Sequence, residues 1–154
     1  MAKLAGSAQV LVQAPPETVY GIVTDVTRVS QWSPECYQCA WLDGAAGPAV
    51  GARFRGRNRR GWLRWVTTCR VSHLENNRVF GFEVVQPVFG VQTRWRYDIE
   101  PAPGGALLRE RFEVLWLFPG VTRFLFGGKA SRQAQLEDNV RQTLARIKAI
   151  AEGG

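Results

Sequence analysis

The stretch ARFRGRNRRGWLRWVTTCRV, residues 52–71, decides the fold of this chain. In its first half an arginine occupies every second position from Arg53 to Arg59, and residues such as Phe54 fall between them. Successive side chains of a β-strand point to opposite faces, so this pattern predicts a strand with a solvent face of arginines and an interior face. After a turn at Gly61 comes a second run, whose positions of interior parity are Trp65, Thr67, Cys69 and Val71. Two strands joined by so short a turn are antiparallel neighbours.

The same β-rich character extends over residues 35–114, and turn-forming residues interrupt it at hairpin spacing. The interruptions fall at residues 44–51, 61, 76–77, 86–90 and 101–105, which divides the region into six strands. Connections this short exclude parallel crossovers, which need about a dozen residues or more. An alternating segment at residues 8–13 adds one strand before them, so we expect a curved antiparallel sheet of seven strands.

Helical segments flank this sheet in the sequence. The Pro15-Pro16 pair ends the first strand and opens a short helix over residues 17–25, and a second short helical turn follows at residues 27–32. After Gly127-Gly128 the chain predicts one long helix, with an apolar stripe formed by Leu136, Val140, Leu144, Ile147 and Ala151. Charged residues, Arg132 among them, are expected away from that stripe. The fold class is therefore α+β.

Parity in the last two strands predicts an aromatic interior that contains one carboxyl group. The inward positions are Trp95, Tyr97 and Ile99 in one strand, and Leu108, Glu110, Phe112 and Val114 in the next. A buried carboxylate without a partner is costly, so Glu110 should be paired, neutral or close to an opening. Two interpretations stay open: Glu110 contacts a ligand, or it lies at the margin of the sheet and reaches water or an arginine.

Length and composition limit the number of domains, the cellular location and the kinds of partner that we expect. A chain of 154 residues with 45% hydrophobic residues can bury a core of its own, and we expect a single domain over residues 1–154. No apolar run reaches the roughly 18 residues of a membrane span and no leader is evident, so we expect a cytoplasmic protein. Three cysteines do not suggest a disulfide framework. The net charge of +7 favours acidic or anionic partners by long-range attraction.

Four short motifs resemble a known family. They are APPETVY at residues 14–20, DV at 25–26 followed by WSP at 32–34, GARF at 51–54 and LARIK at 144–148. With this order of elements, the chain resembles the polyketide cyclase/dehydrase and lipid-transport family of the START and birch-pollen-allergen-like superfamily (SRPBCC), over nearly its whole length. The resemblance implies a helix-grip fold, in which the sheet closes over the long C-terminal helix. It also implies a cavity between them for a lipid, polyketide, sterol or aromatic metabolite.

The leading hypothesis for function is therefore binding, for transport or sequestration, of a hydrophobic small molecule in this cavity. The alternative is an enzyme of the cyclase, aromatase or dehydratase type, and the catalytic residues are then unknown. Such enzymes in the family commonly place an arginine on the inner face of the fourth strand, where this chain has Cys69 while Arg70 points outward. The absence of an evident proton-transfer pair favours binding. The candidate ligand-binding residues are Trp32, Phe54, Asn58, Trp65, Thr67, Cys69, Phe82, Trp95, Tyr97, Glu110, Phe112 and Val140.

Metal and cofactor chemistry finds little support in the sequence. Cys36, Cys39, Cys69 and His73 have the composition of a zinc site, and Cys69 and His73 would share one strand face. Cys36 and Cys39, three residues apart in a strand, should however point to opposite faces unless a bulge intervenes, so we expect no metal. No glycine-rich phosphate loop or nucleophile motif is present, and we expect no cofactor.

Two surfaces could meet a partner. The arginine face could attract nucleic acid, but the aromatic residues fall on the opposite face, whereas single-strand binders present both together. We therefore do not favour nucleic acid as a partner. The apolar stretch from Trp116 to Phe126 either packs at the mouth of the sheet or acts as a portal flap that admits ligand and touches membranes transiently. The oligomeric state cannot be read from the sequence.

Overall fold

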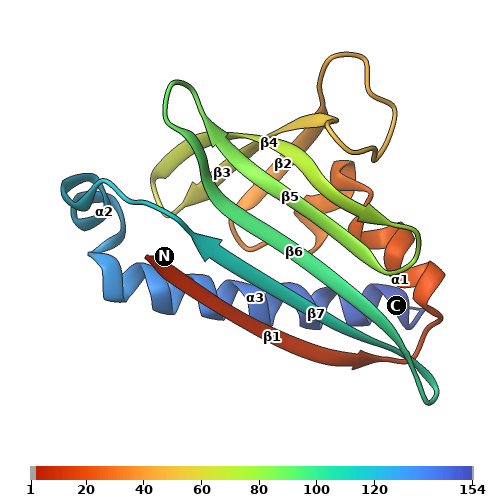
Figure 1. Ribbon diagram of the computed structural model, residues 1–154. Helices are drawn as coiled ribbons and strands as arrows, with labels where there is room; N and C mark the ends of the chain where they lie inside the picture. Colours follow the sequence, from red (N-terminus) through yellow and green to blue (C-terminus); the bar gives the residue numbers. More distant parts are fainter. Residues whose placement is uncertain (1–2, 154) are drawn as a thin grey trace.

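The computed structural model describes residues 3–153, and a curved antiparallel sheet wraps around one long helix (Figure 1). Strand β1 (Leu4–Val12) precedes helix α1 (Pro16–Val23) and the short 3-10 helix η1 (Val26–Gln31). Six strands follow, namely β2 (Cys36–Trp41), β3 (Arg53–Arg60), β4 (Leu63–Glu75), β5 (Val79–Gln86), β6 (Gly90–Ala102) and β7 (Gly105–Val114). Helices α2 (Pro119–Phe126) and α3 (Lys129–Ala151) complete the chain. The predicted seven strands, two short helices and long C-terminal helix are confirmed.

The strand order is β1-β7-β6-β5-β4-β3-β2, with every neighbouring pair antiparallel. Strands β2 to β7 form successive hairpins, and β1 joins the far edge by pairing with β7. Helix α3 runs along the concave side of the sheet (Figure 1), which is the helix-grip arrangement. Antiparallel pairing places the β3–β4 turn, the β5–β6 turn and α2 at one end of the sheet, and α1 at the other (Figure 1).

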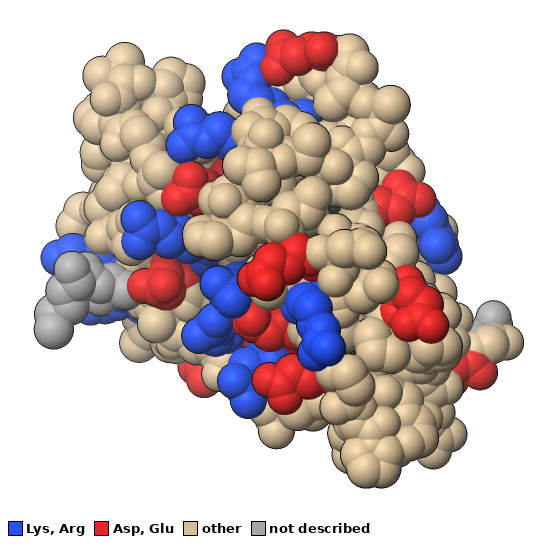
Figure 2. All heavy atoms as spheres, turned by 45° about the vertical axis from the view of Figure 1, so that its right-hand side comes forward, with Lys and Arg blue, Asp and Glu red and all other residues tan. Residues whose placement is uncertain are grey.

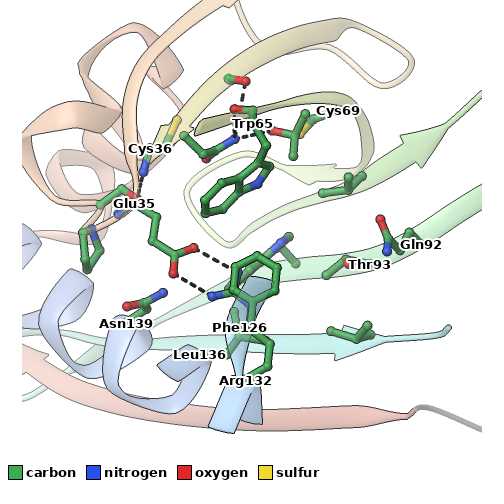
Figure 3. Close-up of a pocket in the computed structure, with 18 of the residues that line it drawn as sticks. Glu35, Cys36, Trp65, Cys69, Gln92, Thr93, Phe126, Arg132, Leu136 and Asn139 are labelled. Atoms are coloured by element: carbon green, nitrogen blue, oxygen red, sulfur yellow. Dashed lines mark hydrogen bonds and ion pairs between the residues drawn. The ribbon is translucent and has the colours of Figure 1, made fainter. Parts of the chain in front are cut away.

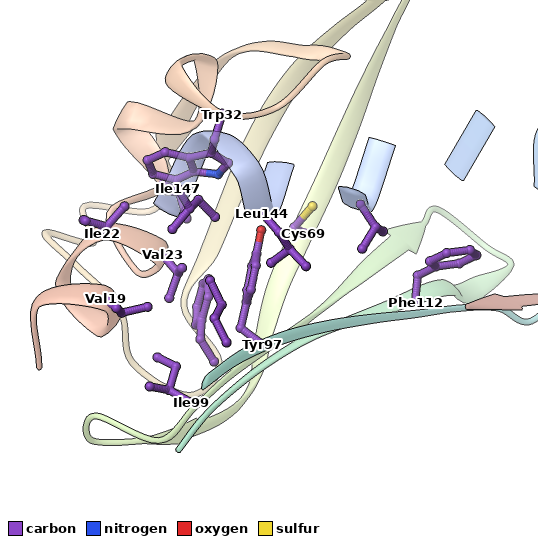
Figure 4. Close-up of a cluster of buried hydrophobic side chains, with 14 of the residues drawn as sticks. Val19, Ile22, Val23, Trp32, Cys69, Tyr97, Ile99, Phe112, Leu144 and Ile147 are labelled. Atoms are coloured by element: carbon purple, nitrogen blue, oxygen red, sulfur yellow. The ribbon is translucent and has the colours of Figure 1, made fainter. Parts of the chain in front are cut away.

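The core is densest at the α1 end. Figure 4 shows Val19 and Val23 of α1 beside Leu144 and Ile147 of α3, over the inner face of the sheet at Ile99, and all five are buried. The predicted parity is confirmed in β3, β4, β6 and β7, since the positions expected inside are buried or half-buried and the arginines between them face outward. The stripe of α3 is likewise buried from Leu136 to Ile147.

Two β-bulges overturn the parity expected for the cysteine and histidine side chains. A register shift between Cys36 and Gln38 turns Cys36 to the same inner face as Cys39. A second shift between Val71 and His73 exposes His73, and Leu74 packs against the core in its place. A bulge adds one residue to one strand of a pair and so reverses the alternation beyond it. The expectation that Cys36 and Cys39 point apart, and that Cys69 and His73 share a face, was wrong.

Two further features differ from the sequence-based expectation, namely the start of β1 and the presence of helix α2. Strand β1 begins at Leu4 rather than at residue 8, because its first residues pair with the end of β7, which has no local sequence signal. The apolar stretch before α3 contains a helix of its own, α2, which ends at Gly127. Gly127 adopts a left-handed φ of 81°, a conformation that favours glycine, and it separates α2 from α3.

The outer face of the sheet is an array of ion pairs rather than a uniformly basic surface. Glu83 pairs with both Arg70 and Arg94, and Asp98 pairs with Arg96 and Arg111. Figure 2 shows basic and acidic side chains side by side on this part of the surface. Neighbouring opposite charges cancel much of the field that would attract a polyanion. The arginines of β4 to β7 are thus largely neutralised.

Candidate functional site

A cavity of about 490 Å³ lies between the inner face of the sheet and α3 (Figure 3). Its wall comes from inner positions of all seven strands, from η1 and the residues that follow it, and from α2 and α3. Three of its lining residues, Arg64, Phe118 and Val121, are exposed to solvent, and they mark the mouth beside α2. The volume lies within the range of small-molecule sites, about 300–1,000 Å³.

Aromatic rings form a continuous wall across the sheet. Phe54 of β3 packs edge-on against Phe82 of β5, with ring centroids 5.2 Å apart, and Phe82 stacks against Trp95 of β6 at 6.5 Å. Trp95 in turn contacts Phe112 of β7 at 5.6 Å. Rings fixed by each other in this way present a rigid apolar surface, which can bury a ligand at little cost in side-chain entropy.

Asn58 and Thr67 form a small polar patch on the same wall. The Asn58 Nδ2 group donates to the Thr67 hydroxyl at 3.2 Å and lies 3.4 Å from the Trp65 carbonyl oxygen. The two side chains therefore satisfy each other, and they can offer their remaining capacity to a ligand.

Glu110 and Tyr97 form the deepest polar group of the cavity. They are direct cross-strand partners on β7 and β6, both are buried, and both line the cavity. Burial raises the pKa of Glu110 to about 8, and the opposing hydrogen bond from Tyr97 is the smaller effect. Among the described residues, the Glu110 Oε1 atom is the one buried side-chain oxygen or nitrogen that lacks a hydrogen-bond partner. A neutral carboxyl group at pH 7 is thus left with unused hydrogen-bonding capacity facing the cavity.

A buried ion pair crosses the mouth. Arg132 of α3 donates two hydrogen bonds to Glu35, at 2.7 and 3.0 Å (Figure 3). Arg60 reaches the same carboxylate at 3.1 Å. The Arg132 guanidinium also lies 4.1 Å from the ring centroid of Phe126 and 5.9 Å from that of Trp65. Burial opposes ionisation of Glu35, but its hydrogen bonds to Arg132 and Asn139 and the charges of Arg132 and Arg60 outweigh burial and lower its pKa.

This pair was missed by the sequence analysis, which placed Arg132 away from the apolar stripe of α3. Arg132 lies on that stripe, because positions 132, 136, 140 and 144 are four residues apart and share one helix face. Extending the stripe by one step toward the N-terminus would have found it. Glu35 carried no comparable signal, because it precedes β2 and its partner is 97 residues away.

The three cysteines line the cavity together and are all free thiols. A hydrogen bond from Cys39 lowers the pKa of the Cys36 thiol, while the same contact and burial raise the pKa of Cys39. Burial raises the pKa of Cys69 to about 12. Within residues 3–153, no three His, Cys, Asp or Glu side chains gather in a way that could hold a metal ion.

Eleven of the twelve candidate ligand-binding residues line the cavity, with Phe112 as the exception. Phe112 is 1% exposed and lies behind Trp95, so it supports the wall without forming part of it. As expected, Cys69 faces inward, whereas Arg70 is on the outer face in an ion pair with Glu83. The lining residues that were not among the sequence-based candidates include Glu35, Arg132, Asn139, Gln86, Gln92 and Thr93.

Known proteins share both the sequence pattern and the fold. The model of the family "Polyketide cyclase / dehydrase and lipid transport" matches residues 3–152. The Polyketide_cyc-like protein Cgl2372 from Corynebacterium glutamicum is 32% identical, with a TM-score of 0.66 over 99% of this chain and 93% of that chain. A START superfamily protein from Mycobacterium smegmatis is 24% identical, with a TM-score of 0.67 and coverage of 95% and 98%. The di-domain ARO/CYC protein BexL, from the BE-7585A biosynthetic pathway, is 18% identical with a TM-score of 0.73, and the match covers 98% of this chain and 50% of BexL. No curated protein sequence matches the chain.

A curved seven-stranded sheet around a C-terminal helix, with a cavity between them, places the chain in the helix-grip fold class. Within that class, the chain belongs to the polyketide cyclase/dehydrase and lipid transport family.

Proposed function

We propose that this protein binds an uncharged, largely apolar small molecule in its cavity, and carries or sequesters it. The observation that carries the proposal is the aromatic wall from Phe54 to Trp95, which encloses about 490 Å³ around a single deep polar group. Removing apolar ligand surface from water against such a wall supplies the affinity, at roughly 25 cal/mol per Å² buried. The family description, which includes lipid transport, agrees with this proposal.

The neutral character of the ligand follows from the polar groups of the cavity. Glu110 carries a proton at pH 7 because burial raises its pKa to about 8, and Arg132 is already neutralised by Glu35. A ligand carboxylate deep in the cavity would find no free cation and would lose its hydration. A hydroxyl or carbonyl oxygen could instead accept a hydrogen bond from Glu110, which lacks one in the structure.

Binding can be tested with N-phenyl-1-naphthylamine, a neutral apolar probe whose fluorescence rises in apolar surroundings. We expect the Trp95→Ala variant to weaken probe binding by about tenfold or more, because truncation of a buried aromatic anchor commonly costs on the order of 2 kcal/mol. The matched control is Arg55→Ala, which alters an exposed outer position on β3 and should leave the affinity unchanged. Equal affinity of Trp95→Ala and the wild type would contradict the proposal. Independently of the probe, native mass spectrometry of protein purified from its own host would identify the natural ligand.

The cyclase or dehydratase alternative has one observation in its favour. A carboxylic acid with a pKa of about 8, opposite a tyrosine in the same cavity, can exchange a proton with a bound ligand near neutral pH. One measurement distinguishes binding from catalysis: the extracted natural ligand is incubated with the protein and then analysed by mass spectrometry. Return of the intact ligand supports binding alone, whereas chemical change that is lost in Glu110→Gln supports the enzyme.

A further inference from the structure

Large apolar side chains are exposed in a ring around the mouth of the cavity. Six of the ten such side chains found among the described residues lie there, and three are strongly exposed: Val88 at 99%, Trp62 at 82% and Phe124 at 80%. They come from three separate elements that meet at this end of the sheet, namely the β3–β4 turn, the β5–β6 turn and α2 (Figure 1). We call this set the mouth ring, and its members are Trp62, Val88, Phe89, Phe118, Val121 and Phe124.

Helix α2 has the pattern of a helix that is covered on both sides. Leu125 and Phe126 line the cavity, Val121 lies at its mouth and is half exposed, Phe124 is directed to solvent, and the polar Thr122 is buried. A helix at the surface of a water-soluble domain normally shows polar residues outward, and one that is apolar all round is usually buried. Part of the ring is also pre-organised, because Phe89, Trp116 and Phe118 pack together with centroids 5.2–5.7 Å apart. The outer side of α2 is thus suited to contact with an apolar partner.

The charge around the mouth ring is positive. Residues 54–74, 84–97 and 114–136, which supply the ring and its surroundings, contain no Asp or Glu. Arg64, Arg123 and Lys129 flank the ring and make no ion pair with any residue between 3 and 153, in contrast to the four outer-face arginines that pair with Glu83 and Asp98. Of the nearby acids, Glu35 is neutralised by Arg60 and Arg132. A negatively charged partner is therefore complementary to this end of the molecule.

We propose that the mouth ring docks on a lipid bilayer that contains anionic phospholipids. In this arrangement the ring side chains insert at the boundary of headgroups and acyl chains, and Arg64, Arg123 and Lys129 face the lipid phosphates. Trp and other large apolar side chains flanked by Lys and Arg have this behaviour at membrane interfaces. The ring side chains project from three separate elements. A fluid lipid surface can surround them without having a shape complementary to theirs. Among the described residues no helix is suited to cross the membrane, so the contact is peripheral.

The test is flotation of the protein with vesicles of phosphatidylcholine alone or with added phosphatidylglycerol. We expect binding to the anionic vesicles that weakens as salt is raised, since screening reduces the attraction of exposed charges. Trp62→Ser and Phe124→Ser should each reduce the partition coefficient by about tenfold, because each removes a side chain that the bilayer would bury. Arg123→Glu should reduce binding to the anionic vesicles specifically. The matched control is Val50→Ser, which alters a 67% exposed residue in the loop at the other end of the sheet.

Three outcomes would overturn this inference. One is absence of binding to anionic vesicles at low salt, and another is equal binding by Phe124→Ser, Trp62→Ser and Val50→Ser. The third is a dimer of the protein in solution that Phe124→Ser converts to monomers, which would assign the ring to a second copy of the chain. The inference does not depend on the proposed ligand, because binding of N-phenyl-1-naphthylamine to Phe124→Ser in the absence of vesicles reports on the cavity alone.

Discussion

Glu110 is the residue at which folding and function compete. Its carboxyl group is buried and one oxygen lacks a partner, an arrangement that the fold tolerates only because the group stays protonated. An apolar residue at this position would pack against Tyr97 and Phe112 and would not have to stay protonated to be buried. The unused hydrogen-bonding capacity is explained if a bound ligand supplies the missing partner.

The pH dependence of stability tests the state of Glu110. Its folded pKa of about 8 lies above the ordinary value of 4.5 for a glutamate carboxyl group, so the unfolded chain releases this proton first. Stability due to Glu110 is therefore fully present below about pH 4.5 and falls as the pH rises toward 8. Between pH 5 and 8 we expect the ligand-free wild type to lose about 3 kcal/mol in free energy of unfolding relative to Glu110→Gln.

Urea denaturation of both proteins across this pH range measures the difference. Tyr97→Phe is the control, because it removes the hydrogen bond that favours the ionised form and should keep the fall with pH. If wild type and Glu110→Gln showed parallel pH profiles, Glu110 would be ionised in the folded protein, and the argument for a neutral ligand would fail.

At the scale of elements, the mouth is held by contacts between α2, α3 and the start of β2. Phe126 at the end of α2 lies between Trp65 of β4, at 5.4 Å, and the Arg132 guanidinium, which Glu35 fixes in place. Gly127 and Gly128, both with positive φ, connect α2 to α3 and allow the angle between the helices to change. We therefore predict that the Glu35–Arg132 pair acts as a latch on α2, through the contact of Arg132 with Phe126.

Breaking the latch should loosen α2 without unfolding the sheet. In Glu35→Gln we expect faster amide hydrogen exchange over residues 119–128 and unchanged exchange in β6, together with faster association of the neutral probe. Glu83→Gln is a matched control, because Glu83 is also shared by two arginines but lies on the outer face.

Acid should act like the Glu35→Gln substitution, since the lowered pKa of Glu35 means that the latch is intact above pH 4.5 and is lost as the pH falls through the folded pKa. Exchange in α2 that is equal in the two variants would contradict the latch.

Parity predicted the elements well wherever alternation was unbroken. Arg53 to Arg59 and Leu108 to Val114 alternate without interruption, and each of these faces was assigned correctly. The errors at Cys36 and His73 arise from bulges, whose position depends on pairing with β3 and β5 rather than on local sequence. Helix α2 escaped prediction because its eight residues have no N-terminal capping side chain, and because apolar residues lie on its outer side beside the single charged residue Arg123.

At the scale of the whole molecule, the sequence predicted the aromatic wall and an apolar stretch at the mouth, but not the contacts that hold the mouth together. The wall depends on which face of a strand a residue occupies, and alternation reveals that. The mouth depends on Glu35, Arg60 and Arg132 converging from elements far apart in sequence, and on α2 folding back over β4. Such contacts are set by the closure of the sheet around α3. Local patterns do not encode them.

Binding in an interior cavity should also stabilise the molecule as a whole. A ligand that binds only the folded chain adds RT ln(1 + [L]/Kd) to the free energy of unfolding, about 2.7 kcal/mol at a hundredfold excess over Kd. For a domain of this size that corresponds to a rise in Tm of roughly 5–10 °C. We expect this rise when N-phenyl-1-naphthylamine is added to protein stripped of ligand by solvent extraction. Trp95→Ala should lose most of it at the same probe concentration, whereas Arg55→Ala should keep it. A probe that bound but left Tm unchanged would have to bind the unfolded chain equally well, and the folded cavity would then not be its site.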